Sequence, residues 1–183
     1  MSYKRWIFVA IFLFGIGLVF GLVTPTGFAT LISEDIAALE ELAGLLASLP
    51  LALVVVIIFI KNASVLLLSF ALSPIFCLIP ILTLTVNGWL LAFVSVIVSQ
   101  EKSVGFVLAG LLPHGIFELP ALIMGEAAAL SFGTVMILAL FKKERRSLVL
   151  PSLKRNLRYL MVALALLVPA AIIETYVTPL LLT

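Results

Sequence analysis

The chain has 183 residues, of which 64% are apolar and 11% are charged, and its formal net charge is +2. Soluble globular proteins are about 45–50% apolar and about 25% charged. Soluble monomers tolerate a contiguous exposed apolar patch of roughly a few hundred Å². A water-soluble monomer with this composition would expose far more. The composition therefore excludes a soluble enzyme, a nucleic-acid-binding domain and a disordered protein. It predicts one integral membrane domain over residues 1–183. Cys77 is the only cysteine, so no intrachain disulfide forms.

The first apolar run follows Lys4 and Arg5 and continues to Ser33. A cleavable signal peptide has an apolar region of roughly 7–15 residues and then a small-residue cleavage site. This run is longer, and no such cleavage site follows it. About 20 helical residues at about 1.5 Å each cross the hydrocarbon core. Residues 6–25 are therefore expected to be a retained first span.

An acidic segment, residues 33–48, follows the first span. Ser33 is a suitable N-cap, and the acidic residues after it favour the positive end of a helix dipole. Apolar residues then repeat at helical spacing, which predicts a short amphipathic helix. It leads into a second span over residues 42–60, in which Pro50 marks a kink. Lys61 would anchor the end of this span at the interface.

Two long apolar stretches come next, residues 62–100 and 103–141, with only one charged pair between them. Each is nearly twice as long as a single crossing requires, so each is expected to fold back. Non-helical backbone at this depth must be covered by protein or by a wet cavity, which predicts that both stretches lie inside the bundle. The predicted helix breaks are Pro74, Pro80, the Asn87–Gly88 pair, Pro113 and Pro120.

A basic loop, residues 142–158, separates the second long stretch from the last apolar run. The positive-inside rule puts this loop and the N-terminus in the cytoplasm, and the acidic segment and the C-terminus outside. An even number of crossings then connects the two cytoplasmic ends, so the fold class is an all-α polytopic transmembrane bundle of five to seven membrane segments with broken or re-entrant helices. The predicted segments are residues 6–25, 42–60, 63–82, 84–100, 103–119, 121–141 and 159–179.

Ionisable side chains inside these apolar runs need an explanation, since a charge near the bilayer centre costs at least about 2.5–3.5 kcal/mol. His114 and Glu118 are one helical turn apart on the same face. Pro120 cannot donate a hydrogen bond to the carbonyl of Ile116, so a polar backbone group is freed beside the pair. The candidate polar cluster within the membrane consists of His114, Glu118, Glu126, Glu174, Asn62 and Asn87.

Three interpretations of this cluster remain open. The first is structural: the side chains hydrogen-bond one another and tie broken helices together. The second is an ion or proton site at a broken helix, as in secondary transporters. The third is a metal site with hydrolytic chemistry, for which His114, Glu118 and Glu174 are the candidate ligands. Glu174 either reaches the membrane interface or pairs with His114 across the bundle. No sequence motif identifies a cofactor, and none for nucleotide hydrolysis or redox chemistry occurs.

Several of these motifs together resemble the stage II sporulation protein M family. The specific part is the PHGIFELPA block at residues 113–121. The FIKN sequence at 59–62, the Asn87–Gly88 pair, and Glu174 followed by Pro179 agree in order and spacing. The resemblance extends over nearly the whole chain. It implies a polytopic membrane protein, and it implies no catalytic residues; His114, Glu118 and Glu174 match the polar signature of the family.

The resemblance also implies a function. The namesake of the family is a scaffold that recruits peptidoglycan-degrading enzymes to the septal membrane during engulfment, and similar proteins occur in organisms that make no spores. The leading hypothesis is therefore a non-enzymatic scaffold or assembly protein of the inner membrane. The alternatives are a small transporter or channel, and an intramembrane metallohydrolase. The expected partners are the lipid bilayer, other membrane or cell-envelope proteins and a second copy of the chain, but no nucleic acid.

Overall fold

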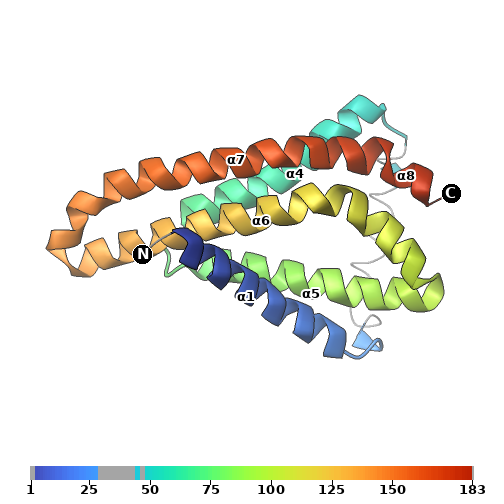
Figure 1. Ribbon diagram of the computed structural model, residues 1–183, viewed down its shortest axis with the longest axis horizontal. Helices are drawn as coiled ribbons and strands as arrows, with labels where there is room; N and C mark the ends of the chain where they lie inside the picture. The colour runs from blue at the N-terminus through green and yellow to red at the C-terminus, as the bar shows by residue number, and fades with distance from the viewer. Residues whose placement is uncertain (1–2, 29–43, 46–47, 183) are drawn as a thin grey trace.

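The computed structural model describes residues 3–28, 44–45 and 48–182. Within these ranges the regular structure is entirely helical (Figure 1). The central helix, α6, packs against every other long helix. The helices are α1 (Tyr3–Val23), α4 (Leu51–Leu72), α5 (Leu78–Glu101), α6 (Val104–Phe141), the 3₁₀ helix η1 (Lys143–Leu148), α7 (Val149–Tyr176) and α8 (Thr178–Leu181).

Five helices in the described ranges are long and apolar enough to cross a membrane: α1, α4, α5, α6 and α7 together with η1. Large apolar side chains are exposed on their outer faces; for example, Phe8 is 72% and Phe12 is 67% exposed. Such faces are stable against lipid and not against water. The chain is thus a multi-pass membrane protein, and the predicted all-α transmembrane bundle is confirmed with five spans.

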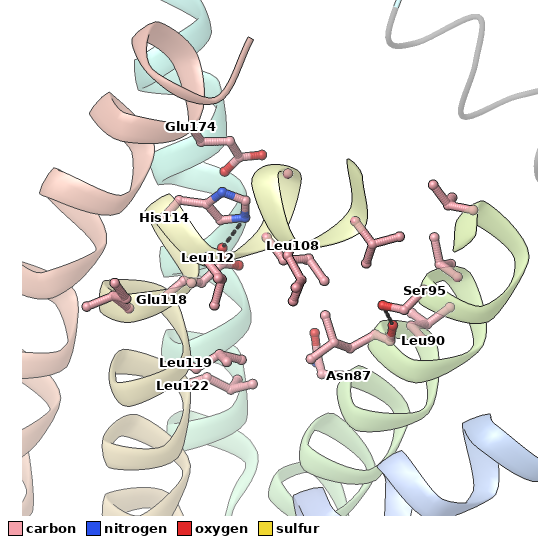
Figure 2. A pocket seen from close by; sticks show the side chains of 18 of the residues that line it. Asn87, Leu90, Ser95, Leu108, Leu112, His114, Glu118, Leu119, Leu122 and Glu174 are labelled. Atoms are coloured by element: carbon pink, nitrogen blue, oxygen red, sulfur yellow. Dashed lines mark hydrogen bonds and ion pairs between the residues drawn. The ribbon is translucent and has the colours of Figure 1, made fainter. Parts of the chain in front are cut away.

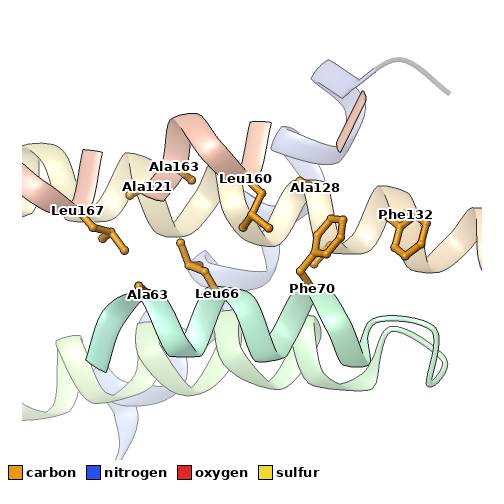
Figure 3. Close-up of a cluster of buried hydrophobic side chains, with 10 residues drawn as sticks. Ala63, Leu66, Phe70, Ala121, Ala128, Phe132, Leu160, Ala163 and Leu167 are labelled. Atoms are coloured by element: carbon orange, nitrogen blue, oxygen red, sulfur yellow. The ribbon is translucent and has the colours of Figure 1, made fainter. Parts of the chain in front are cut away.

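The core of the bundle lies where α4, α6 and α7 meet (Figure 3). Phe70 and Phe132 stack there with their ring centroids 5.1 Å apart. Alanines from all three helices let the backbones approach closely, which is how membrane helices gain packing contacts. In the most apolar part of α6, 56% of the residues are buried, against 11% in α4. The buried members of this core are Ala63, Leu66, Phe70, Ala121, Ala128, Ala129, Phe132, Leu160, Ala163 and Leu167.

The first long stretch turns earlier than expected. The chain reverses between α4 and α5 at residues 73–77, a segment that includes Pro74. Pro80 lies in the first turn of α5, where a missing N–H breaks no helical hydrogen bond. The expected boundary between residues 63–82 and 84–100 is therefore wrong, because that position is in the interior of α5.

Gly88 explains why Asn87–Gly88 is not a turn. It is buried in the middle of α5, facing α1, and a Cβ atom there would collide with the carbonyl oxygen of Phe14. Gly17 of α1 meets the backbone of Thr85 in the same way. The glycines let α1 and α5 touch along their backbones, so the residue that resembles a turn signal is a packing residue.

The second long stretch is one helix, so the expected division into residues 103–119 and 121–141 is wrong. Pro113 and Pro120 both lie inside α6. Each proline removes one helical hydrogen bond, and this bends a helix without necessarily ending it. Figure 1 shows the first part of α6 bending away from the remainder towards the end of α5. At its other end α6 extends beyond the other helices together with the start of α7 (Figure 1). The residues of α6 that exceed one crossing therefore extend the helix and do not fold back into the membrane.

The second span is also displaced from its expected position at residues 42–60. It begins after Pro50, and as α4 it continues to Leu72. Lys61 therefore lies halfway along a span and not at its end. The apolar sequence after residue 62 is long enough to complete the crossing, and the exposed lysine can extend its aliphatic stem along the helix. The predicted amphipathic helix over residues 33–48 lies almost wholly outside the described residues.

The basic segment over residues 142–158 is helical and is not a loop. Its first part is η1, and its second part forms the first turns of α7. The helix of the last span therefore begins before the expected residue 159, at Val149, and ends before the expected residue 179, at Tyr176. Lysine and arginine are good helix formers, so the charges of this segment do not prevent it from being helical.

Candidate functional site

A group of polar side chains from separate helices meets inside the bundle (Figure 2). His114 and Glu118 come from α6, and Glu174 comes from α7. One ligand atom from each of the three residues lies within 4.8 Å of the others. The Nε2 atom of His114 is 3.7 Å from the nearer carboxylate oxygen of Glu118, and their side chains are only 13% and 32% exposed. The structure thus brings together the three residues that the sequence suggests as possible metal ligands.

Helical geometry accounts for this arrangement. Residues four apart lie one above the other on the same face, so His114 and Glu118 point the same way. The chain reverses through η1, which makes α7 antiparallel to α6 and brings its last turn beside this face. Glu174 is on that last turn. The sequence therefore encodes the site through one i, i+4 pair and one helical hairpin.

Two further side chains complete the group. The amide nitrogen of Asn62 on α4 donates a hydrogen bond of 3.2 Å to Glu118 Oε1. The Nδ1 atom of His114 is 3.4 Å from the hydroxyl oxygen of Thr178 in α8. We call the five residues His114, Glu118, Glu174, Asn62 and Thr178 the polar cluster. Sequence reasoning missed Thr178; the available signal was a hydroxyl residue immediately before Pro179, where the chain restarts as a short helix.

The polar cluster borders a cavity of about 670 Å³ between α5 and the first half of α6. Leucine and valine make up half of the residues in its wall, and His114, Glu118 and Glu174 provide its most polar edge. Asn87 and Ser95 of α5 face it from the other side (Figure 2). A polar edge on an apolar cavity within a membrane bundle is the usual form of a small-ligand or ion site.

The charges of the polar cluster set its chemistry. Glu174 is repelled by Glu118 and attracted by His114 and by Lys61. Two carboxylates this close in an apolar medium repel each other, so the polar cluster favours a nearby positive charge. Lys61 is one such charge, and a bound metal ion would be another.

The donor set fits a metal ion of intermediate hardness. One imidazole and two carboxylates are ligands that Zn²⁺ and Mn²⁺ accept in proteins. With bonds of about 2.1 Å, tetrahedral ligand atoms lie about 3.4 Å from one another. The three ligand atoms lie within 4.8 Å, so they must move closer together to hold such an ion. The geometry is compatible with an ion and is not closed around one.

The structure does not bring every candidate residue into this group. Glu126 is fully buried, and its carboxylate accepts a hydrogen bond from Ser69 of α4. Its second oxygen, Oε1, has no hydrogen-bond partner in the described part of the chain. Asn87 lines the cavity, but its side chain donates to the carbonyl of Thr83 in its own helix at 2.7 Å. The Glu126–Ser69 pair is therefore a second polar contact, separate from the polar cluster.

A second feature is the basic hairpin, which we define as residues 139–158, where α6, η1 and α7 extend beyond the other helices (Figure 1). All charged side chains in it are exposed. The positive ones are Lys142, Lys143, Arg145, Arg146, Lys154, Arg155 and Arg158, and the one acidic residue among them is Glu144.

Comparison with known proteins identifies relatives over the whole membrane domain. The family profile described as stage II sporulation protein M matches residues 8–179. An uncharacterised protein of Methanocaldococcus jannaschii is 26% identical over 174 residues, which cover 94% of this chain and 93% of that protein. A second uncharacterised protein of the same organism is 28% identical over 127 residues, or 68% of this chain and 56% of that protein. No solved structure matches the chain.

Proposed function

Because the chain belongs to the stage II sporulation protein M family, we propose that it is a non-enzymatic membrane scaffold that assembles other membrane or cell-envelope proteins. The family profile covers four of the five spans completely and the first span from residue 8, so the proposal concerns the whole domain and not one motif. Recruitment to a septal membrane during engulfment is the role of the namesake in spore-forming bacteria. Only the more general role, the recruitment of partner proteins, is proposed here.

The basic hairpin is the observation that carries this proposal. α6 has 38 residues, or about 57 Å of helix, while the hydrocarbon core is about 30 Å thick. The excess, together with η1 and the first turns of α7, forms a helical projection whose charged side chains are exposed. A rigid, charged projection on a membrane bundle supports protein docking, since charge complementarity steers association and selects partners.

The orientation of the bundle is part of the same proposal. The positive-inside rule favours a cytoplasmic location for the basic hairpin and for Lys4 and Arg5. With five spans, the C-terminus is then extracytoplasmic. The expected partners are membrane proteins with acidic cytoplasmic segments and, for the lipid-facing sides, a second copy of this chain.

Site-specific photo-crosslinking in the native host tests this role. A photoreactive amino acid at Lys143 is expected to give discrete adducts with other proteins, because this position is on the projection. The same amino acid at Lys102, which is exposed between α5 and α6, is the matched control. Equal adducts from both positions, or none from Lys143, would contradict the scaffold proposal.

A second candidate function is supported by the polar cluster: a cation or proton site in a small transporter or channel. Its support is the closeness of His114, Glu118 and Glu174 at the edge of the cavity. Binding of a metal ion is the same hypothesis with a different ion. Hydrolytic chemistry at such a metal is the third alternative.

One substitution separates these candidates. Glu118→Gln keeps the size of the side chain and its ability to accept from Asn62, but removes the charge. A scaffold keeps its adducts after this change. A transporter loses flux, and a metal site loses its ion as measured by elemental analysis of the purified protein. Glu101→Gln, at an exposed glutamate outside the polar cluster, is the control for a nonspecific charge effect.

A further inference from the structure

A second cavity, of about 610 Å³, lies where the base of the basic hairpin meets α1. Its polar lining comes from three helical elements of the hairpin region: Ser131 and Thr134 of α6, Arg145 of η1, and Ser152 and Arg155 of α7. Trp6 of α1 forms part of its wall. It has no residue in common with the polar cluster. Two guanidinium groups and three hydroxyls are hydrogen-bond donors around one cavity, an arrangement that favours a ligand rich in acceptors.

Within the described residues, neither arginine side chain has a hydrogen-bond or ion-pair partner in the protein. In the described residues, no carboxylate lies within 4 Å of Arg145 or Arg155. Glu144, adjacent to Arg145 in sequence, forms no ion pair with it either. Guanidinium groups bind phosphate through paired, charge-assisted hydrogen bonds, and they do this better than lysine.

Ser131 gives independent support. It is 1% exposed, yet its hydroxyl oxygen has no hydrogen-bond partner within the described part of the chain. A buried hydroxyl normally finds a partner, so this one is available to a ligand in the cavity that it lines. The Ser152 hydroxyl accepts a hydrogen bond from Asn156 at 3.1 Å, and its own proton is free to be donated.

The remaining wall indicates which phosphate compound fits. Most of the accessible lining is apolar, with Val135 and Leu138 of α6 and Leu148 beside the arginines. A free phosphate ion would leave these side chains without contact, whereas the glycerol group and the first methylenes of a lipid chain would cover them. Tryptophan at the edge, as with Trp6, is typical of the headgroup level of a bilayer.

We propose that this cavity binds the phosphate diester of an anionic glycerophospholipid, with Arg145 and Arg155 on the phosphate and Ser131 donating to one of its oxygens. Basic pockets between membrane helices are known sites for anionic headgroups. This inference goes beyond the scaffold proposal, because a bound lipid would fix the base of the hairpin whether or not the tip recruits proteins.

Native mass spectrometry of the purified protein in detergent tests the proposal. The probes are dioleoylphosphatidylglycerol, dioleoylphosphatidylcholine and inorganic phosphate. Wild-type protein is expected to retain one phosphatidylglycerol in preference to phosphatidylcholine. The variant R145Q/R155Q should bind it about tenfold more weakly or worse, because it loses the charge-assisted hydrogen bonds. Ser131→Ala should weaken binding by a smaller factor, about threefold.

Arg158→Gln is the matched control, since Arg158 is an exposed arginine one turn further along α7 that does not line the cavity. It is compared with the single variant Arg155→Gln, which also removes one arginine. Equal weakening of lipid binding by the two single variants would mean general attraction of headgroups to a basic surface and would overturn the proposal. Competition by inorganic phosphate at the lipid's own concentration would assign the cavity to a free anion and would also overturn it. The exposed arginine variants keep the bundle intact, and a size-exclusion profile checks this.

Discussion

Asn62 of α4 donates a hydrogen bond to Glu118 of α6 across 3.2 Å, in the same region where Glu118 faces His114. This contact ties the least covered of the five spans to the most buried one. It also explains why Asn62 occupies the middle of an apolar helix. Its amide donates to Oε1 of Glu118, while Oε2 of the same carboxylate faces His114.

Removing this donor should destabilise the bundle. Asn62→Ala leaves Glu118 Oε1 without its partner, and the expected loss is about 1 kcal/mol, a typical value for one hydrogen bond between membrane helices. The measurement is the apparent Tm in detergent. Ser64→Ala is the control, since the Ser64 hydroxyl bonds only to a carbonyl of its own helix. A Tm for Asn62→Ala as high as that of the control would show that the Asn62 contact is dispensable.

Glu126 should tolerate the loss of its charge but not the loss of its side chain. It is fully buried and accepts a hydrogen bond from Ser69. Glu126→Gln retains the volume and an acceptor oxygen, so its Tm should stay close to the wild-type value. Glu126→Ala leaves a cavity and an unpaired serine, and should reduce the free energy of unfolding by about 2–5 kcal/mol. If both variants were equally unstable, the charge itself would be the important property.

The contact between α1 and α5 should be sensitive to single methyl groups. A Cβ atom at Gly17 would overlap the backbone of Thr85, so Gly17→Ala must push the helices apart, at an expected cost of about 1–3 kcal/mol. At Gly15, two residues earlier, a Cβ atom would have no neighbour within 4 Å among the described residues, so Gly15→Ala should not destabilise the contact. The measurement is the fraction of each variant that stays monodisperse in size-exclusion chromatography after heating to a series of temperatures. Gly17→Ala should aggregate at a lower temperature than Gly15→Ala. Equal aggregation temperatures would mean that the α1–α5 contact is looser than described.

The proposed orientation predicts a labelling pattern. In a Cys77→Ser background, a cysteine at Lys143 should react with a membrane-impermeant maleimide only after the cells are permeabilised. A cysteine at Thr26, exposed beyond the opposite end of α1, should react in intact cells. The reverse pattern would invert the bundle and place the basic hairpin outside.

Sequence reasoning predicted the fold class because lipid is a demanding solvent: apolar length and charge distribution together leave few arrangements. It also predicted that His114, Glu118 and Glu174 were candidates for one site. Two of them share a helix face, and charges inside a membrane bundle tend to pair.

The boundaries within the long stretches could not be predicted. Gly88 is equally suited to a turn and to close helix packing, and only the position of α1 decides between them. A proline such as Pro120 is compatible both with a bend within a helix and with the end of a helix. The contact between Ser69 and Glu126 depends on how α4 lies against α6, which the sequence pattern of either helix alone does not specify.

The most direct test of the scaffold account compares two variants by the same readout, the adducts formed by a photoreactive amino acid at Ser147, an exposed position of η1. Reversing the charge of the hairpin tip with Lys142→Glu and Lys143→Glu should abolish these adducts, while Glu118→Gln should leave them unchanged. Adducts that persist after charge reversal but disappear in Glu118→Gln would contradict the account and would transfer the function of the protein to the polar cluster.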